Sequence, residues 1–334
     1  MNTIRMTLDS MSGIAGVKAN DTFAIWLRRM TRTLGLPLVG LLVFVFIWQA
    51  GASRIDTSLG KFPGPVQVYE QAGSLISEHV REREREAAFY ERQELRNAER
   101  VAKDPGYEPK IRDYTGKPTF FDQIVTSLIT VLAGFAIGAL IAIPLGICIG
   151  LNGSLYAVLN PVIQLFKPVS PLAWLPLVTM VVSAVYVTDD PLFAKSFLTS
   201  LFTVSLCCLW PTLINTAVGV SAISADLQNV SKVLRLSWLT HVYRIVLPSS
   251  VPMIFTGLRL SFGIAWMVLI AAEMLAQNPG LGKFVWDEFQ NGSSDSLGRI
   301  MVAVLVIGLI GFLLDRIMLL IQRTVSWDKN AITR

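Results

Sequence analysis

Long apolar runs separated by polar segments dominate the 334 residues of this chain. A helix needs about 20 residues to cross the ~30 Å hydrocarbon layer of a membrane, so apolar runs of at least about 18 residues are candidate spans. The pattern therefore predicts an all-α membrane protein with six transmembrane helices. The six runs cover 34–53, 124–151, 169–188, 192–220, 251–276 and 300–322.

The third run is the least regular of the six. Pro168, Pro171 and Pro176 crowd its start, and proline removes a backbone donor from a helix. The Asp-Asp-Pro turn at 189–191 that follows it is short. A broken or re-entrant segment is therefore an alternative to a straight third span.

The first run also resembles a secretory signal, because Ala50, Gly51 and Ala52 form a small-residue pattern typical of a cleavage site. Its ~20 apolar residues exceed the length of an ordinary signal core. An uncleaved membrane anchor is the favoured interpretation.

Basic residues beside the apolar runs predict the orientation of the chain. Arg28, Arg29 and Arg32 precede the first run, and the positive-inside rule then puts the N-terminus in the cytoplasm. Six crossings return the C-terminus to the same side, and the basic residues there agree with this orientation. They are Arg323, Lys329 and Arg334.

The spans divide the chain into segments on alternating sides of the membrane. Residues 1–20 show no periodicity and are predicted to form a disordered tail. A cytoplasmic loop at 224–250 lies within the core of five spans. The predicted segments are a cytoplasmic tail at 1–33, the first span at 34–53, an extracytoplasmic segment at 54–123, the core at 124–325 and a cytoplasmic tail at 326–334.

Composition agrees with a membrane protein and argues against several other classes. Hydrophobic residues make up 52% of the chain, charged residues 16%, and the mean hydropathy is +0.53. The net charge of +5 is spread over several polar segments without interleaved aromatic residues, so nucleic-acid binding is not predicted. The spans and loops contain no paired acid and base or nucleophile constellation, which argues against an enzyme.

Cysteine and histidine are too few and too scattered to predict a metal site. Cys148, Cys207 and Cys208 lie inside apolar runs without ligand spacing, so we expect reduced core residues. The two histidines, His79 and His241, lie in different regions of the chain. Neither a histidine-based metal site nor a catalytic triad is predicted.

A charged segment at 77–118 separates the first two spans. Good helix formers predict a helix over 78–103, which the Asp-Pro-Gly run at 104–106 should end. Nine basic and ten acidic residues between Glu78 and Asp113 nearly balance, which is typical of a solvated surface. An outer lip that contacts a partner protein is the alternative.

The segment from 226 to 252 interrupts two apolar runs with amphipathic sequence. At helical spacing Leu227, Val230 and Leu234 form one apolar stripe. Ser224 is the predicted N-cap, and Asp226 suits the positive end of the helix dipole.

A second short helical run follows this stripe. Its apolar side consists of Leu239, Val242, Tyr243 and Val246, and the Leu-Pro pair at 247–248 should close it. Two short helices at an angle would form a cytoplasmic elbow. A helix lying in the membrane interface is the alternative.

The elbow and the span after it resemble the cytoplasmic loop and following span of ABC-importer permeases. In that family the loop carries Glu-Ala-Ala, then Gly, then Leu-Pro. Here Asn229, Val230 and Ser231 stand at the Glu-Ala-Ala, Arg235 stands at the Gly, and the Leu-Pro at 247–248 matches. Arg235 cannot adopt a positive φ as cheaply as Gly, which puts the detail of the contact in question.

Four further stretches extend the resemblance to the nitrate/sulfonate/bicarbonate branch, and within it to nitrate-type permeases. It covers residues 34–325 except the charged segment at 77–118. The stretches resemble a periplasmic Pro-x-Pro, the second span, a Pro-rich third segment and an outer loop. They are PGPV at 63–66, SLITVLAGFAIGALIAIPLGICIGL from Ser127, NPVIQLFKPVSPLAWLPLV from Asn160 and AAEMLAQNPGLGKFVWDEFQN from Ala271.

The resemblance implies a type I importer permease in a bacterial inner membrane, paired with a second permease copy, expected to be identical, around a pore. The elbow would be a coupling helix that docks in a groove of a cytoplasmic ATPase, and an extracytoplasmic solute-binding protein would deliver the substrate. No G-x-x-x-x-G-K-[ST] occurs in the chain, so ATP and Mg²⁺ are expected on the partner and no cofactor on this chain. The implied coupling residues are Asp226, Leu227, Asn229, Val230, Ser231, Leu234, Arg235 and Pro248.

The substrate implied by the resemblance is a small anion, with nitrate or nitrite first and bicarbonate, cyanate and sulfonates as alternatives. A stand-alone channel or ion-coupled carrier is the rival of another class. A carrier would need a carboxylate relay and usually repeated spans, and the sequence shows neither.

Ionisable residues inside spans are costly and are candidates for function. Arg259 and Asp315 lie at similar depths in antiparallel spans, which predicts an ion pair or hydrogen bond; an anion contact by Arg259 and snorkelling are the alternatives. Glu273 lies near the outer end of its span, where it could reach the interface. Arg316 is the fourth such residue. Gly134 and Gly138 form a G-x-x-x-G that predicts a close helix contact.

Overall fold

A computed structural model describes residue 31 and residues 35–57, 60–104, 106–188, 190–293 and 295–325. The chain divides into two compact units, residues 1–69 and 70–334. The predictions for both tails lie outside the described residues, residue 31 apart. So do the basic residues Arg28, Arg29, Arg32, Lys329 and Arg334 and the turn residue Asp189.

In its described residues the first unit contains an apolar helix and a small hairpin, followed by the start of a charged helix. Helix α2 (Leu36–Ala52) has 17 residues, slightly fewer than the span predicted at 34–53. Nearly all of its large apolar side chains are exposed, as expected for a helix that meets lipid or another protein. The antiparallel strands β1 (Asp56–Thr57) and β2 (Gly60–Lys61) follow it.

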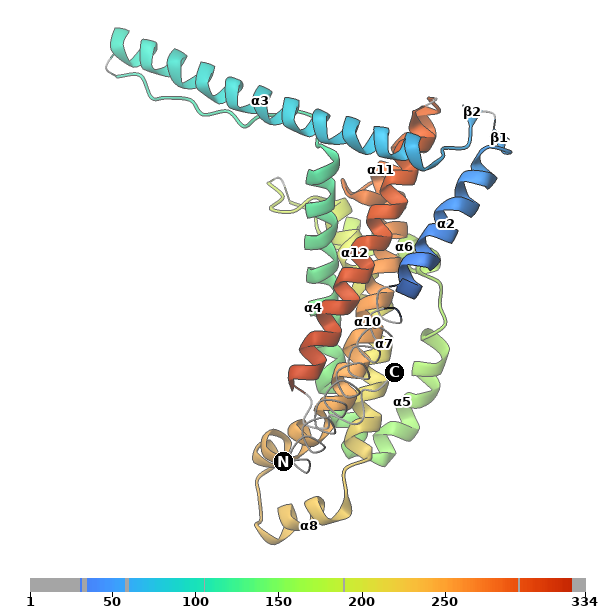
Figure 1. The fold of residues 1–334 in the computed structure, drawn as a ribbon. Coiled ribbons are helices and arrows are strands. Elements are labelled where there is room, and N and C mark those ends of the chain that lie inside the picture. Colours follow the sequence, from blue (N-terminus) through green and yellow to red (C-terminus); the bar gives the residue numbers. More distant parts are fainter. Residues whose placement is uncertain are drawn as a thin grey trace, which may run out of the picture. The chain divides into compact units, whose positions relative to one another are not determined.

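Four long apolar helices form the body of the second unit (Figure 1). Each is long and apolar enough to cross a membrane, which confirms the predicted second, fourth, fifth and sixth runs as helices. They are α4 (Phe120–Leu151), α7 (Lys195–Ser221), α10 (Leu247–Ala276) and α12 (Ser296–Val325).

Helices α4 and α7 pack closely because α4 presents small residues to α7. A Cβ added at Gly134 would lie 2.9 Å from the carbonyl oxygen of Leu201, and one at Gly138 would lie 2.9 Å from Sγ of Cys208. The close contact predicted from the G-x-x-x-G is therefore confirmed. The same face continues with Gly146 and Gly150, which the sequence analysis did not single out.

The third predicted span is broken. Helix α6 (Pro171–Val185) forms within the predicted run 169–188, but its 15 residues are too few to span alone, and α5 (Gly153–Phe166) meets it at 101°, as the broken or re-entrant alternative predicted. Ser170 caps α6 by accepting a hydrogen bond from the backbone of Leu172, and Pro171 occupies the first turn. Proline has no N–H to donate there, which suits the start of a helix rather than its interior.

The fifth span begins earlier than predicted, and Pro248 does not end a helix. Helix α9 (Trp238–His241), the π-helical turn η2 (Val242–Val246) and α10 form one 39-residue helix from Trp238 to Ala276. Pro248 lies in the first turn of α10, directly after the widened turn. A π turn changes the hydrogen-bond register, so the chain passes the proline without leaving the helix.

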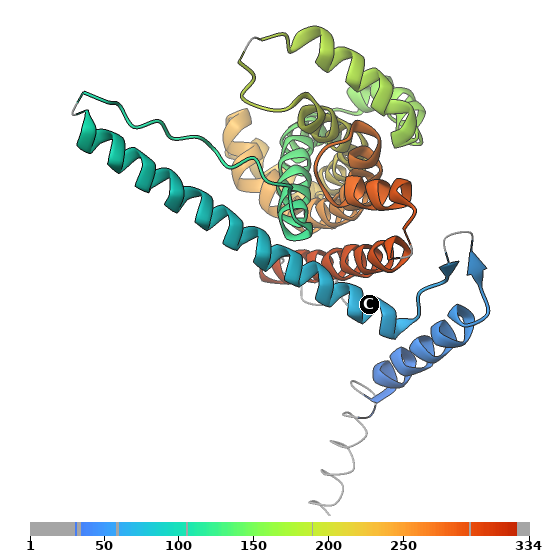
Figure 2. The ribbon, with the colours of Figure 1, turned by 90° about the horizontal axis from the view of Figure 1, so that it is seen from above.

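Helix α3 (Pro65–Lys103) confirms the predicted helix in the charged segment and its end before residue 104, although it starts earlier than 78. Within the second unit, residues 107–118 run back along α3 (Figures 1 and 2). Gln93 exchanges hydrogen bonds with the backbone of Arg112, and Asn97 donates to the carbonyl of Lys110. These contacts hold the returning segment against the helix.

Two short helices mark opposite ends of the second unit. Helix α8 (Ala225–Val233) lies beyond the ends of the long helices, where α7 connects to α9 (Figure 1). Helix α11 (Leu281–Asn291) lies at the other end, beside the start of α4 and α3. The amphipathic pattern predicts the helix at α8, whereas no pattern predicts the one at α11.

Candidate functional site

Helix α8 presents apolar side chains to its surroundings. Ser231 is buried against the rest of the unit, whereas Val230 is 48% and Leu234 is 63% exposed. Val233, next to the predicted stripe, is 81% exposed. Exposed apolar side chains on a short helix are available for a contact with another surface. Ser224 occupies the N-cap position, as predicted, but its side chain makes no capping hydrogen bond.

The turn after α8 has a helix-ending geometry that glycine usually provides. Arg235 has φ of 46°, in the left-handed region. Its N–H donates to the carbonyl of Lys232, and the N–H of Leu236 donates to the carbonyl of Ser231. This is the Schellman motif, in which the left-handed residue is commonly glycine. The turn therefore forms with Arg235, at a conformational cost of about 1 kcal/mol.

The predicted pair between α10 and α12 is confirmed. Nε of Arg259 lies 2.7 Å from Oδ1 of Asp315, and a second guanidinium nitrogen lies 3.0 Å from Oδ2. The two parallel hydrogen bonds fix the orientation of both groups. Gln322 donates to Thr256 at 3.2 Å between the same two helices. Arg316 instead lies over the ring of Phe312, 4.9 Å from its centre.

We expect Asp315→Ala to lower the free energy of unfolding in detergent by about 1–2 kcal/mol, because it leaves the Arg259 guanidinium without its bidentate acceptor. The exchange Arg259→Asp/Asp315→Arg should recover at least half of that loss. Arg316→Ala is the control and should cost about 0.5 kcal/mol. Thermal unfolding of the purified variants measures each effect, and an exchange variant less stable than Asp315→Ala would contradict the pairing.

Glu273 does not reach the membrane interface, so that interpretation is wrong. Its side chain is fully buried, 0% exposed, near the end of α10. The carboxyl group bonds Oγ of Ser127 in α4 at 2.8 and 2.9 Å and accepts the N–H of Gly282 at 3.0 Å. Oγ of Ser127 also accepts the N–H of Leu281 at 2.8 Å. One buried network therefore joins α4, α10 and α11.

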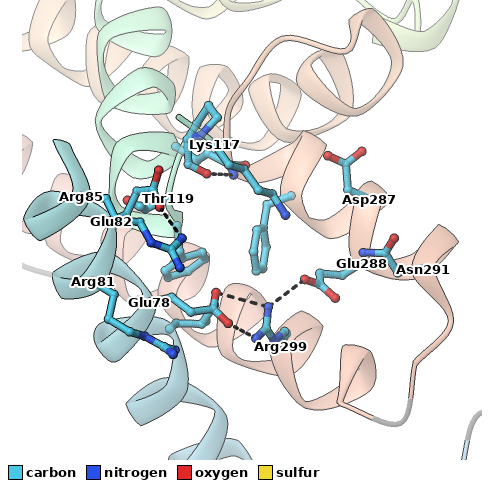
Figure 3. A pocket seen from close by; sticks show the side chains of 15 residues that line it. Glu78, Arg81, Glu82, Arg85, Lys117, Thr119, Asp287, Glu288, Asn291 and Arg299 are labelled. Carbon is cyan, nitrogen blue, oxygen red and sulfur yellow. Dashed lines mark hydrogen bonds and ion pairs between the residues drawn. The ribbon is translucent and has the colours of Figure 1, made fainter. Parts of the chain in front are cut away.

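A polar pocket of about 380 Å³ lies at the end of the second unit where α3, α4, α11 and α12 meet (Figure 3). Arg299 forms ion pairs with Glu78 and Glu288, and Ser296 donates to Glu288 at 2.8 Å. On the opposite wall Arg85 pairs with Glu82 at 3.3 Å.

Tyr114 lies close to this wall of the pocket. It donates a hydrogen bond of 2.8 Å to Glu82, and that bond raises the pKa of Tyr114. Glu82 therefore has two partners from the charged segment. Arg85 lies on α3, and Tyr114 lies in the returning segment at 107–118.

The sequence pattern identified the ionisable residues of the spans, but it did not identify the groups that form hydrogen bonds with Glu273. Ser127 and the α11 backbone carried no signal, because hydroxyl residues and glycines are common in membrane helices. The pocket joins residues more than 200 positions apart, such as Glu78 and Arg299, and no local pattern marks such a pair. Among the described residues no group of three or more metal-binding side chains occurs.

The comparison with protein families gives one match over most of this unit. Residues 134–327 match the family model described as "binding-protein-dependent transport system inner membrane component". The match contains α7, α8, α10 and α12, and therefore both the exposed face of α8 and the Arg259–Asp315 pair.

Curated relatives match over 61% to 97% of the chain. The bicarbonate transport system permease protein CmpB of Synechococcus elongatus is 35% identical, over 97% of this chain and 99% of its own length. The nitrate import permease protein NrtB of Synechocystis is 32% identical over 86% of this chain and 88% of its own. NrtB of Synechococcus elongatus is 38% identical over 61% of this chain and 69% of its own.

A solved structure shares the fold. A chain of the MetNI methionine ABC transporter, in an inward-facing conformation, superimposes with a TM-score of 0.52 at 13% identity. The superposition covers 62% of this chain and 96% of that chain. At this identity the likeness concerns the arrangement of helices alone.

Proposed function

Because this chain belongs to the family of binding-protein-dependent transport system inner membrane components, as a permease of the nitrate and bicarbonate type, we propose that it forms the membrane path of an ATP-driven importer of a small anion. The relatives that match most of the chain carry bicarbonate and nitrate in their names, so these two anions are the proposed substrates. Cyanate and sulfonates are the alternatives within the same class.

The exposed apolar face of α8 is the observation that carries the proposal. A rigid helix with exposed Leu227, Val230 and Leu234 suits a groove on another protein. The sequence contains no G-x-x-x-x-G-K-[ST], which fits an energy supply from a partner. We propose that α8 is the coupling helix and that ATP and Mg²⁺ bind to a cytoplasmic ATPase. The further coupling residues are Asp226, Asn229 and Ser231 on α8, Arg235 in the turn after it, and Pro248 in the first turn of α10.

The proposed assembly contains two permease copies in a bacterial inner membrane, with an extracytoplasmic binding protein that selects the anion. In this proposal the first helix and the broken pair α5–α6 add two crossings to the four long helices, and both termini and α8 lie in the cytoplasm. In a stand-alone channel or carrier, α8 would instead lie in the membrane interface.

We expect a pull-down of the detergent-solubilised chain from its native membranes to recover a nucleotide-binding subunit. The double change Val230→Glu/Leu234→Glu should abolish recovery, because two carboxylates cannot enter an apolar groove without a large desolvation cost. Lys232→Glu, on the other side of α8, changes the net charge by the same two units and should leave recovery intact. Recovery of the chain without a nucleotide-binding subunit from wild type would contradict the proposed coupling.

A further inference from the structure

A second pocket, of about 540 Å³, lies between α8 and the ends of the long helices, and we call it the α8 pocket. Its walls are the last residues of α4 and α7, the start of the helix at Trp238, and one face of α8 with the turn after it. The residues of that face are Gln228, Ser231, Lys232 and Arg235, which follow one another at helical spacing. This face differs from the apolar stripe proposed for coupling, so the α8 pocket has no part in that contact.

The α8 pocket carries positive charge without an acid to balance it. Among the residues that the structure describes, Lys232 and Arg235 line it and no aspartate or glutamate does. Neither cation forms an ion pair or a side-chain hydrogen bond with another described residue. Asp226 is the single acid in the sequence from 191 to 272, and it does not line the pocket. His241, the third ionisable group of the lining, carries no negative charge in either protonation state. The two cations are therefore a net surplus, which attracts an anion.

Arg235 holds its place in the lining at a conformational cost. Its φ of 46° lies in the left-handed region, where glycine is the common residue after a helix. Glycine would form the same turn without that cost, but it would remove one of the two cations. A role for the guanidinium group explains why arginine stands in a position that its backbone does not favour.

The α8 pocket lies at the depth of lipid headgroups. Helix α7 has 27 residues and is about 40 Å long at 1.5 Å per residue. That length matches a bilayer with both of its headgroup layers, ~40–45 Å thick, so the end of α7 at Ser221 reaches the level of the phosphates. Trp238 also lines the pocket and is 58% exposed, and tryptophan is enriched at this membrane interface.

Apolar surface adjoins the α8 pocket. Leu239 and Tyr243 follow Trp238 one helical turn apart, and both are largely exposed. Leu151 and Trp238 also line a neighbouring pocket where α4 meets α5. A ligand with a charged group and an apolar part therefore uses both the cations and this surface, whereas a free inorganic anion uses the cations alone.

We propose that the α8 pocket binds the headgroup of an anionic phospholipid of the cytoplasmic leaflet, such as phosphatidylglycerol. The phosphate pairs with Lys232 and Arg235, and the glycerol hydroxyls meet the uncharged polar side chains of Gln228 and Ser231. Phosphatidylethanolamine fits less well, because its ammonium group finds no acid in the described lining. This inference goes beyond the proposed coupling and takes from it only the side of the membrane.

Native mass spectrometry of the purified, delipidated full-length chain tests the site, with equal amounts of phosphatidylglycerol and phosphatidylethanolamine of the same acyl chains. We expect one phosphatidylglycerol per chain to be retained, with about 10-fold preference over phosphatidylethanolamine. Arg235→Gly and Lys232→Gln should each remove most of this preference. Excess inorganic phosphate should not displace the lipid, because it makes no apolar contacts.

Two variants separate lipid binding from general effects on the protein. Arg235→Gly relieves the left-handed strain, so it should melt close to the wild type or above it while it loses the lipid. Arg244→Gln is the matched control, because it removes the same charge from an exposed arginine of the same segment outside the lining. It should retain phosphatidylglycerol as the wild type does.

Four results would each overturn the lipid site. They are equal retention of the two lipids by the wild type, full retention by both Arg235→Gly and Lys232→Gln, an equal loss in Arg244→Gln, which indicates unspecific attraction, and displacement by phosphate, which assigns the pocket to a free anion. The pull-down described above tests the coupling separately. If the wild type retains the lipid but recovers no nucleotide-binding subunit, the coupling fails and the lipid site stands.

Discussion

Glu273→Ala should leave little folded protein, with a loss of about 3–5 kcal/mol in the free energy of unfolding. The substitution removes the acceptor of the Gly282 N–H and of the Ser127 hydroxyl, both of which are buried. It also leaves a cavity where α4, α10 and α11 meet. Unsatisfied donors and a cavity act together here, which is why we expect the cost to exceed that of breaking the more exposed Arg259–Asp315 pair.

Thermal unfolding followed by size exclusion in detergent measures this effect, with an expected fall of about 10 °C in Tm. Glu273→Gln is the matched control, because its side-chain oxygen still accepts both hydrogen bonds and its volume is nearly unchanged; it should cost about 1 kcal/mol. Ser127→Ala removes the other half of the network and should fall between the two. If Glu273→Ala and Glu273→Gln melt together, the hydrogen bonds of the carboxyl group do not hold this region.

Gly146→Leu should separate α4 from α7 and prevent correct folding. A Cβ at this position would lie 2.8 Å from the carbonyl oxygen of Leu213 and 2.7 Å from Cβ of Thr216. Backbone and a short β-branched side chain cannot move away as a flexible side chain can, so the two helices must move apart. We expect a cost of at least about 3 kcal/mol, because the whole glycine face loses its contacts together.

Gly308→Leu in α12 is the control for this change. The same side chain is added to a long apolar helix, but a Cβ at Gly308 would have nothing within 4 Å. It should express and elute as the wild type does, since leucine is also the better helix former. A Gly146→Leu protein that elutes and melts as Gly308→Leu does would show that the α4–α7 contact contributes little to stability.

Hydrophobic pattern predicted the long helices of the body because length alone identifies them. It also predicted the Arg259–Asp315 pair, since depth in two antiparallel helices follows from counting residues. The broken pair α5–α6 was left open, because three prolines within nine residues allow either a kink or a sharp bend. Packing against α7 decides between a kink and a sharp bend, and the local sequence carries no information about that packing.

The failures around Pro248 and Glu273 have physical reasons. Proline ends most helices, and the sequence gives no sign that a π turn will carry the helix past it. A glutamate near the end of a span normally reaches water, but α11 folds back over Glu273 and covers it. The pocket around Glu78 and Arg299 was missed because its charges belong to segments that meet only in the folded chain. The positive φ at Arg235 was not predicted. Arginine replaces the family's glycine there, and this replacement suggested that the left-handed turn would not form.

The unbroken helix from Trp238 to Ala276 has a mechanical consequence. At 1.5 Å per residue its 39 residues make a rod about 58 Å long. One end follows the turn after α8, and the other carries Glu273 and its bonds to α4 and α11. A tilt imposed at the α8 end must either swing the far end as a lever or be absorbed in the π turn at Val242–Val246. On the proposed coupling, the π turn at Val242–Val246 and Pro252 within α10 are the places where such a tilt would be absorbed before it reaches the opposite end of the helix.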